Sequence, residues 1–111
     1  MTPKSISAFI RRRGRDVVLR RLSGGAQPSH LDVVVKAVIR GYKPSEITGT
    51  LQQGDRLLFA GNTEIAEARW PGPPKRGDVV LDGGKAFTIV APDIRFIGGE
   101  AGLHVLTIRG G

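Results

Sequence analysis

The sequence contains no cysteine, few aromatic residues and no long apolar run. The absence of cysteine among its 111 residues excludes disulfide bonds, thiolate nucleophiles and cysteine-ligated metal centres. Its apolar runs are far shorter than the roughly 20 residues that span a bilayer. No apolar segment near the N-terminus precedes a small-residue cleavage site, as a secretory signal would. We therefore expect cytoplasmic synthesis and no membrane partner.

Histidine is scarce as well, which argues against catalysis. His30 and His104 are the only two, and neither has the spacing of a zinc ligand set. His104 lies in an apolar stretch, where a core or edge histidine is the ordinary interpretation. The serines lack a nucleophile-elbow context, and the glycine pairs lack the strand-to-helix setting of a phosphate-binding loop. The sequence predicts a protein that is not an enzyme and needs no cofactor or metal.

The residues that are abundant favour a β-fold. Aromatic residues make up only 5% of the chain, so Val, Ile and Leu must form the core, while 16 Gly and 7 Pro provide frequent turns. Residues 31–40 alternate apolar and polar, as a half-buried strand does. The strongest local signal is a hairpin in which residues 78–81 and 86–90 flank the Gly-rich turn 82–85. Other strands are expected at 16–22, 56–60 and 103–108, with a weaker one at 48–52. A loop with a single helical turn is expected at 42–47, helix or strand at 62–70, and loops at 71–77 and 92–102. The fold class predicted is mainly β: a small closed or nearly closed antiparallel β-barrel or sandwich of about six strands with a short N-terminal helix.

Two parts of the chain are expected to differ in character. Residues 1–14 are predicted to form a basic amphipathic helix or arm, and residues 15–111 a single β-barrel domain. Pro3 suits the first position of the helix and Gly14 its end. A helix this short is not stable alone, so its apolar face must pack on the barrel or on a neighbour. That face holds Ile6, Phe9 and Ile10.

Positive charge is concentrated at the N-terminus. The net charge is +7, and the first 22 residues supply +6 of it through seven bases and one acid. Three interpretations stay open: a solvated helix end, contact with an acidic partner, or contact with nucleic-acid phosphates. The candidate interaction residues of this basic arm are Arg11, Arg12, Arg13, Arg15, Arg20 and Arg21.

A second candidate contact lies in the proline-rich loop at 71–77. Trp70 precedes the loop, and a tryptophan beside stiff prolines can anchor in a partner's pocket. The alternative is that Trp70 caps the protein's own core. The candidate anchor residues are Trp70, Pro71, Lys75 and Arg76.

Four segments carry a resemblance to a known family. Residues 42–47, Gln-Gln-Gly-Asp-Arg at 52–56, Trp-Pro-Gly-Pro-Pro at 70–74 and Arg-Gly-Asp-Val-Val-Leu-Asp-Gly-Gly at 76–84 are similar to small head–tail joining (neck or head-closure) proteins of tailed bacteriophages and prophages. The likeness extends over about residues 15–109. It implies a small β-barrel with a short helix, added in several copies as a ring in the virion neck after assembly in the bacterial host cytoplasm. Its implied partners are other neck proteins, either portal and adaptor proteins or tail proteins.

Alternatives to the neck assignment differ in the partner they require. A tail-terminator or minor tail protein would have similar architecture. A small basic nucleic-acid-binding barrel would agree with the sequence pI near 10.8. The aromatic residues do not cluster on one strand, as they do in single-strand-binding barrels, so any DNA contact is expected to be non-specific.

Overall fold

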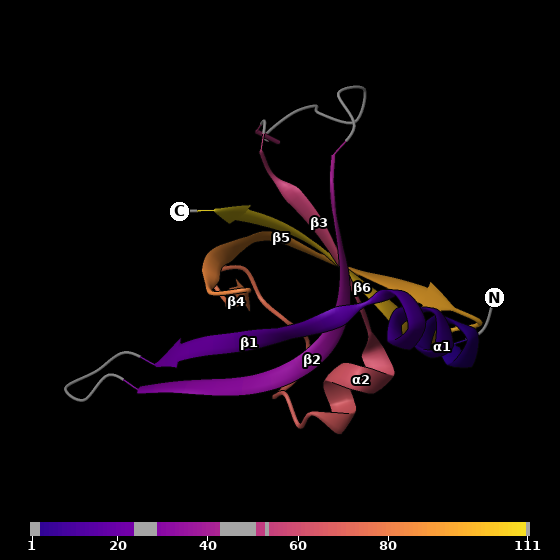
Figure 1. Cartoon of the computed structure of the whole chain (residues 1–111). Coiled ribbons are helices and arrows are strands. Elements are labelled where there is room, and N and C mark those ends of the chain that lie inside the picture. Colours follow the sequence, from indigo (N-terminus) through magenta and orange to yellow (C-terminus); the bar gives the residue numbers. More distant parts are fainter. Residues whose placement is uncertain (1–2, 24–28, 43–50, 53, 111) are drawn as a thin grey trace.

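The protein is a closed six-stranded antiparallel β-barrel with a helix packed on its outside (Figure 1). The computed structural model describes residues 3–23, 29–42, 51–52 and 54–110. Strand order around the barrel is β1-β2-β3-β6-β5-β4, so the predicted fold class is confirmed. The strands are β1 (Arg15–Ser23), β2 (Ser29–Gly41), β3 (Arg56–Gly61), β4 (Val79–Asp82), β5 (Lys85–Ile97) and β6 (Glu100–Gly110).

The core is built from branched aliphatic side chains that alternate along the strands. In β2, Val35 and Ala37 are buried, and Val33 and Ile39 pack against the core, as the period-two pattern predicts. Closing the sheet gives every strand two neighbours over at least part of its length and removes a free edge there. The buried core cluster is Val17, Leu19, Val35, Ala37, Leu58, Ala60, Ile65, Trp70, Val80, Phe87, Ile89, Leu106 and Ile108.

The β1–β2 hairpin extends beyond the barrel, on the side opposite α1 (Figure 1). β1 pairs with β2 from Arg15 to Ser23, but its pairing with β4 covers only Val18 to Arg20. Beyond Arg20, no second strand of the described chain pairs with β1. Leu31, predicted on the apolar face, is therefore exposed.

Residues 92–102, predicted as a loop, are mostly strand. β5 continues through Pro92 to Ile97, Gly98 and Gly99 form a tight turn, and β6 begins at Glu100. β4 pairs with β5 only up to Thr88, so the later part of β5 has a ladder partner on one side alone. Proline has no backbone N–H to donate. Pro92 is tolerated there because no described strand pairs with β5 on its open side.

The open helix-or-strand assignment at 62–70 resolves as a helix followed by a turn. α2 (Asn62–Glu67) begins directly after β3 and ends at Ala68, and Arg69 has φ +63°. The loop with a helical turn predicted at 42–47 lies outside the described residues except for Tyr42, as does most of the strand predicted at 48–52. Residues 51 and 52 are not in a strand.

α1 (Pro3–Arg13) packs its apolar face on the chain's own barrel. Ile6 and Ile10 are buried, and the helix contacts β2, β3, β6 and α2. Gly14 directly follows the helix, and glycine is required there because space is short. A Cβ at this position would lie 2.5 Å from the carbonyl oxygen of Ile10 and 2.8 Å from that of Ala37. The Gly14 N–H also donates to the Ile10 carbonyl at 2.7 Å.

Candidate interaction surface

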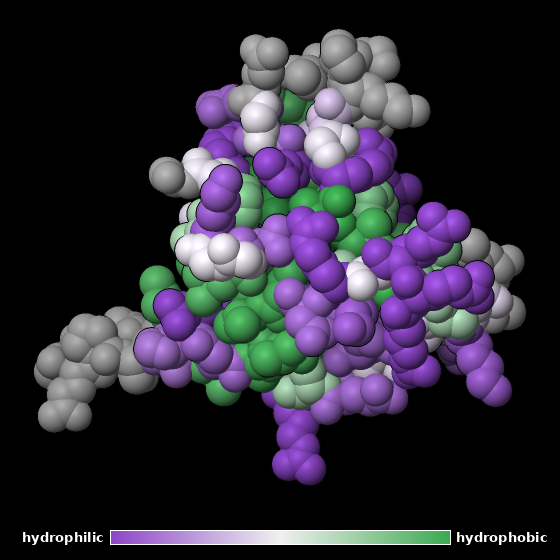
Figure 2. All heavy atoms as spheres, viewed as in Figure 1, coloured by the Kyte–Doolittle hydropathy of each residue, from purple (hydrophilic) through white to green (hydrophobic). Residues whose placement is uncertain are grey.

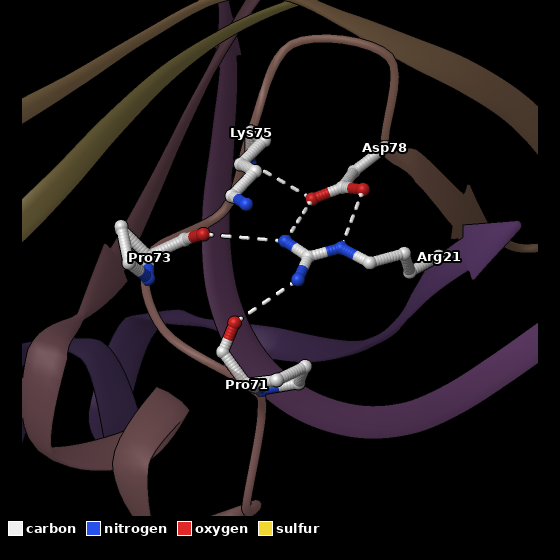
Figure 3. A network of polar contacts seen from close by, with 5 residues as sticks. All are labelled: Arg21, Pro71, Pro73, Lys75 and Asp78. Carbon is white, nitrogen blue, oxygen red and sulfur yellow. Dashed lines mark hydrogen bonds and ion pairs between the residues drawn. The ribbon is translucent and has the colours of Figure 1, made fainter. Parts of the chain in front are cut away.

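Arg21, one of the predicted interaction residues, is a clamp inside the chain's own fold (Figure 3). Its guanidinium donates to both carboxylate oxygens of Asp78 at 3.0 and 2.8 Å. It also donates to the carbonyl oxygens of Pro71 and Pro73 at 3.0 and 3.3 Å. The Asp78 side chain is only 7% exposed. Hydrogen bonding to Asp78 raises the pKa of Arg21, so this arginine stays charged and holds the proline-rich loop against β1.

Asp78 belongs to one of two turns of the same construction. In the turn 52–55, the Gln52 N–H donates to the Asp55 carboxylate at 3.0 Å, and the Asp55 N–H donates back to the Gln52 carbonyl at 3.0 Å. The same two bonds close the turn 75–78, at 2.8 and 3.0 Å. The third residue of each turn is a glycine, with φ of +96° and +95°. Only glycine adopts this left-handed conformation without strain, which explains the repeated Gly-Asp sequence.

Each of these turns is tied to a distant strand by an arginine. Arg109 in β6 donates to both oxygens of Asp55 at 2.9 Å, as Arg21 does to Asp78. The Asp55 side chain is 1% exposed. The hydrogen bonds from Arg109 hold the pKa of Asp55 below its usual range. Both turns therefore have a structural role in the barrel.

The other two arginines of β1 are also paired with carboxylates. Arg15 bonds both oxygens of Asp82 at 2.9 and 2.6 Å, and Arg20 bonds both oxygens of Asp32 at 2.8 Å. These hydrogen bonds lower the pKa of Asp82 and of Asp32. Of the six arginines predicted to form one basic arm, three lie in β1 and make bidentate pairs within the chain.

Trp70 is not an exposed anchor, which corrects the prediction made for it. Its side chain is only 5% exposed and belongs to the core cluster. The Arg21 guanidinium lies 4.8 Å from the Trp70 ring centroid and covers it. Pro71, Lys75 and Arg76 are exposed on the loop that follows. The alternative interpretation, that Trp70 caps the core, is therefore the correct one.

The arginines at the end of α1 are held far more loosely. Arg11 makes a single contact of 3.4 Å with Glu64, and its side chain is 59% exposed. Arg12 and Arg13 are exposed, and no carboxylate among the described residues pairs with either of them. Phe9 is 48% exposed although it lies one turn before them. This side of α1 therefore leaves Arg12, Arg13 and about half of the Phe9 side chain exposed.

An apolar pocket opens beside the exposed side of α1. We call it the α1 groove; its volume is about 160 Å³ and only apolar atoms line it. Two of its residues, Phe59 and Leu103, point outward from β3 and β6 and also line a wider groove of about 540 Å³ along the barrel's outer face. Figure 2 shows hydrophilic side chains over the part of the view where α1 lies. Apolar atoms are exposed near the centre of the molecule in the same view. The α1 groove is lined by Ile6, Phe9, Ile10, Phe59 and Leu103.

A third groove, where β3, β5 and β6 meet the turn 52–55, is basic. Arg56, Lys85 and Arg109 line it around the buried Asp55, and its volume is about 620 Å³. The Arg56 guanidinium lies 5.6 Å from the Phe87 ring centroid. A surface of this kind can attract phosphates by charge alone.

His104, the histidine of the apolar stretch, is a core residue. Its side chain is buried, Nε2 lies 2.9 Å from Oδ1 of Asn62, and burial lowers its pKa. Over the described part of the chain, no three His, Asp or Glu residues gather as a metal site would require. No helix in the same residues has the length and apolar character needed to cross a membrane.

Comparison with family models and with curated proteins found no match. No protein-family model matches the sequence, and no curated protein is significantly similar to it.

The α1 groove was not predicted from the sequence, and neither were the two pairs Arg21–Asp78 and Arg109–Asp55 that hold the Gly-Asp turns. Signals for both are present in the sequence. Residues 57–60 are apolar without alternation, which indicates that this strand presents apolar side chains on both faces. The recurrence of Gly-Asp directly before β3 and β4 marks two buried aspartates that require a cationic partner.

Proposed function

We propose that this protein is a non-enzymatic structural component of a tailed phage or prophage virion. In this role it joins head to tail in the neck through protein–protein contacts, as one subunit of a ring. The observation that carries the interaction role is the exposed side of α1. There Phe9 is 48% exposed, and Arg12 and Arg13 make no ion pair with a described carboxylate, although most other described acids and arginines are paired.

The neck assignment itself rests on the resemblance. Two of the segments that carry it, 52–56 and 76–84, include the Gly-Asp turns that precede β3 and β4. The likeness therefore concerns residues that set the fold, and a small closed barrel is the architecture that it implies. The docked α1 adds a surface on which such a barrel can be joined to a neighbour.

The test is to follow the protein into particles. A tagged copy is expressed during induction of the prophage that encodes it, and particles are sedimented and their protein stoichiometry is measured. We expect a fixed number of copies in DNA-filled heads and whole virions. Deletion of the gene is expected to leave full heads without tails, and a plasmid copy restores joining. A protein that stays in the soluble fraction contradicts the proposal, whereas copies found only on free tails favour the tail-side alternative.

A second candidate function, non-specific nucleic-acid binding, is favoured by the basic groove of Arg56, Lys85 and Arg109. Electrophoretic shifts of duplex DNA over a salt series test it. Log affinity should fall linearly with log salt, with a slope of about −0.9 for each phosphate neutralised. The variant Lys85→Glu should reduce that slope by about 1. No shift at low salt rules out this candidate.

A further inference from the structure

We propose that the α1 groove receives one apolar side chain from an extended, acidic segment of a partner protein. The inference rests on the proposed function and specifies the contact by which this chain joins its neighbour. Three properties of the surface carry it: the size of the groove, its continuation along the barrel, and the charge around it.

The size of the α1 groove fits one side chain. Its volume of about 160 Å³ is close to that of cavities that hold a benzene ring, about 150 Å³. Small-molecule sites are larger, roughly 300–1,000 Å³, and contain a few convergent polar groups. The α1 groove has only apolar lining. It therefore suits an aromatic or branched aliphatic anchor, of the kind that dominates protein–protein contacts.

The α1 groove continues into the wider groove on the outer face of β3, β5 and β6. Phe59 and Leu103 line both, so a chain whose anchor side chain is seated beside α1 can run on along the barrel. The outer-face groove is also partly apolar, with Leu57 and Val105 in its lining. An extended segment uses both grooves, whereas a single small ligand would fill only one.

The charge around the two grooves favours an acidic segment. Arg12 and Arg13 follow Phe9 by three and four residues, so they lie beside it on one side of α1. The Arg40 guanidinium lies 5.8 Å from the Phe59 ring centroid, where the grooves meet. Asp93 is the only acid in either lining among the described residues, and it is already paired with Arg95 at 2.8 Å.

A nucleic acid and a second copy of this chain each match the two grooves less well. A nucleic acid could meet the arginines, but it would leave the apolar groove empty. A second copy of this chain offers few acids, because among the described ones only Glu67 and Glu100 lack an ion pair. A different protein that presents an apolar side chain between acidic neighbours matches both the apolar lining of the α1 groove and the positive charge around it.

Photocrosslinking in assembling particles tests the occupant. Benzoylphenylalanine replaces Phe9 in the full chain during prophage induction, and crosslinked peptides are identified by mass spectrometry. We expect a crosslink to one segment of another virion protein with Asp or Glu beside its apolar residue. The matched control places the probe at Phe96, which is 66% exposed and outside the groove lining, and gives no crosslink to that segment. A crosslink to another copy of the chain, to DNA, or to a segment without acids overturns the inference.

Charge reversal provides an independent readout. Arg12→Glu and Arg13→Glu should each lower the crosslink yield about fivefold, as expected for the loss of one surface ion pair and the gain of a repulsion. Arg69→Glu makes the same change in net charge at an exposed position outside both groove linings and should leave the yield unchanged. Equal losses in all three variants would overturn the groove as the cause.

Particle content separates this inference from the proposed function. The copy number in sedimented particles is measured in the same preparations. Absence of the wild-type chain from particles contradicts the proposed function. A normal copy number without a crosslink at position 9 overturns the α1 groove inference and leaves the proposed function standing.

Discussion

The arginines of α1 and those of β1 are close in sequence but have opposite structural roles. Arg13 and Arg15 are separated by Gly14 alone. Arg15, Arg20 and Arg21 each make a bidentate pair with an aspartate of the barrel. Arg12 and Arg13 make no such pair among the described residues. A cluster of like charges in a sequence therefore does not indicate a shared surface. The helix or strand that carries each side chain decides where it lies and with which residues it can pair.

The two regions also differ in how they are attached. α1 is held to the barrel by buried Ile6 and Ile10, which is an apolar contact. The end of β1 is held to the proline-rich loop by the partly buried Arg21–Asp78 pair and its carbonyl contacts. Charge is thus paired within the fold in β1, whereas Arg12 and Arg13 of α1 have no carboxylate partner among the described residues. The predictions below test this difference.

The largest effect is expected from Arg21→Ala. This change leaves the buried Asp78 carboxylate without its guanidinium and uncovers Trp70, so unfolding free energy should fall by about 4 kcal/mol. Urea unfolding measures it. Arg21→Lys should recover only part of the loss, because an ammonium group lacks the planar fork that bonds both carboxylate oxygens. A small effect, equal to that of Arg13→Ala, would mean that the two regions do not differ.

Ile10→Ala should have the next largest effect. Ile10 is 1% exposed, and truncation of a buried isoleucine leaves a cavity that costs about 3 kcal/mol. Amide exchange within α1 should accelerate while exchange in β5 and β6 changes less. Phe9→Ala is the control on the exposed side of the same helix and should change stability little. Equal losses from both changes would indicate that Phe9 also belongs to the docking face.

Acid should weaken the arginine–aspartate pairs of β1 and β6 without involving α1. The pKa values of Asp32, Asp55 and Asp82 are lowered in the folded state by their arginine partners. Their contribution is therefore present above the unfolded pKa of about 3.9 and is lost as pH falls through the lower folded values. Urea midpoints between pH 7 and pH 2 should decline below about pH 4. Asp55→Asn should reduce that decline, whereas Arg13→Ala should leave it unchanged.

The smallest effect on stability is expected from the double change Arg12→Ala and Arg13→Ala. Both side chains are exposed, so thermal and urea midpoints should stay at the wild-type values. Incorporation into particles, measured by copy number after sedimentation, should fall. A marked loss of stability would show that these arginines hold α1 in place.

Much of the fold was predictable because its signals are local. Three such signals depend on residues that are near in sequence. They are the alternation at 31–40, the turn 82–85 between two β runs, and the presence of Pro3 at the start of α1 and Gly14 just after its end. The failure at residues 92–102 has a physical cause. Pro92 signals a break, but it lies in a stretch of β5 with an open side.

The candidate site was predicted only in part, because its residues come together from distant elements. The α1 groove combines Phe9 with Phe59 and Leu103, and no local pattern relates these three positions. Trp70 was named as an anchor because of the prolines beside it. It is buried in the core cluster, and its ring is covered by Arg21, which is remote in sequence and adjacent in the fold.

The sequence by itself determined the secondary-structure class, the helix and its end, and the turn 82–85, because backbone sterics and hydrophobic periodicity act over a few residues. Only the tertiary structure decided which arginines are structural and which are available. A bidentate pair requires a carboxylate at a fixed position, and barrel closure brings Asp78 to Arg21 across 57 residues of sequence. It brings no described carboxylate to Arg12 or Arg13.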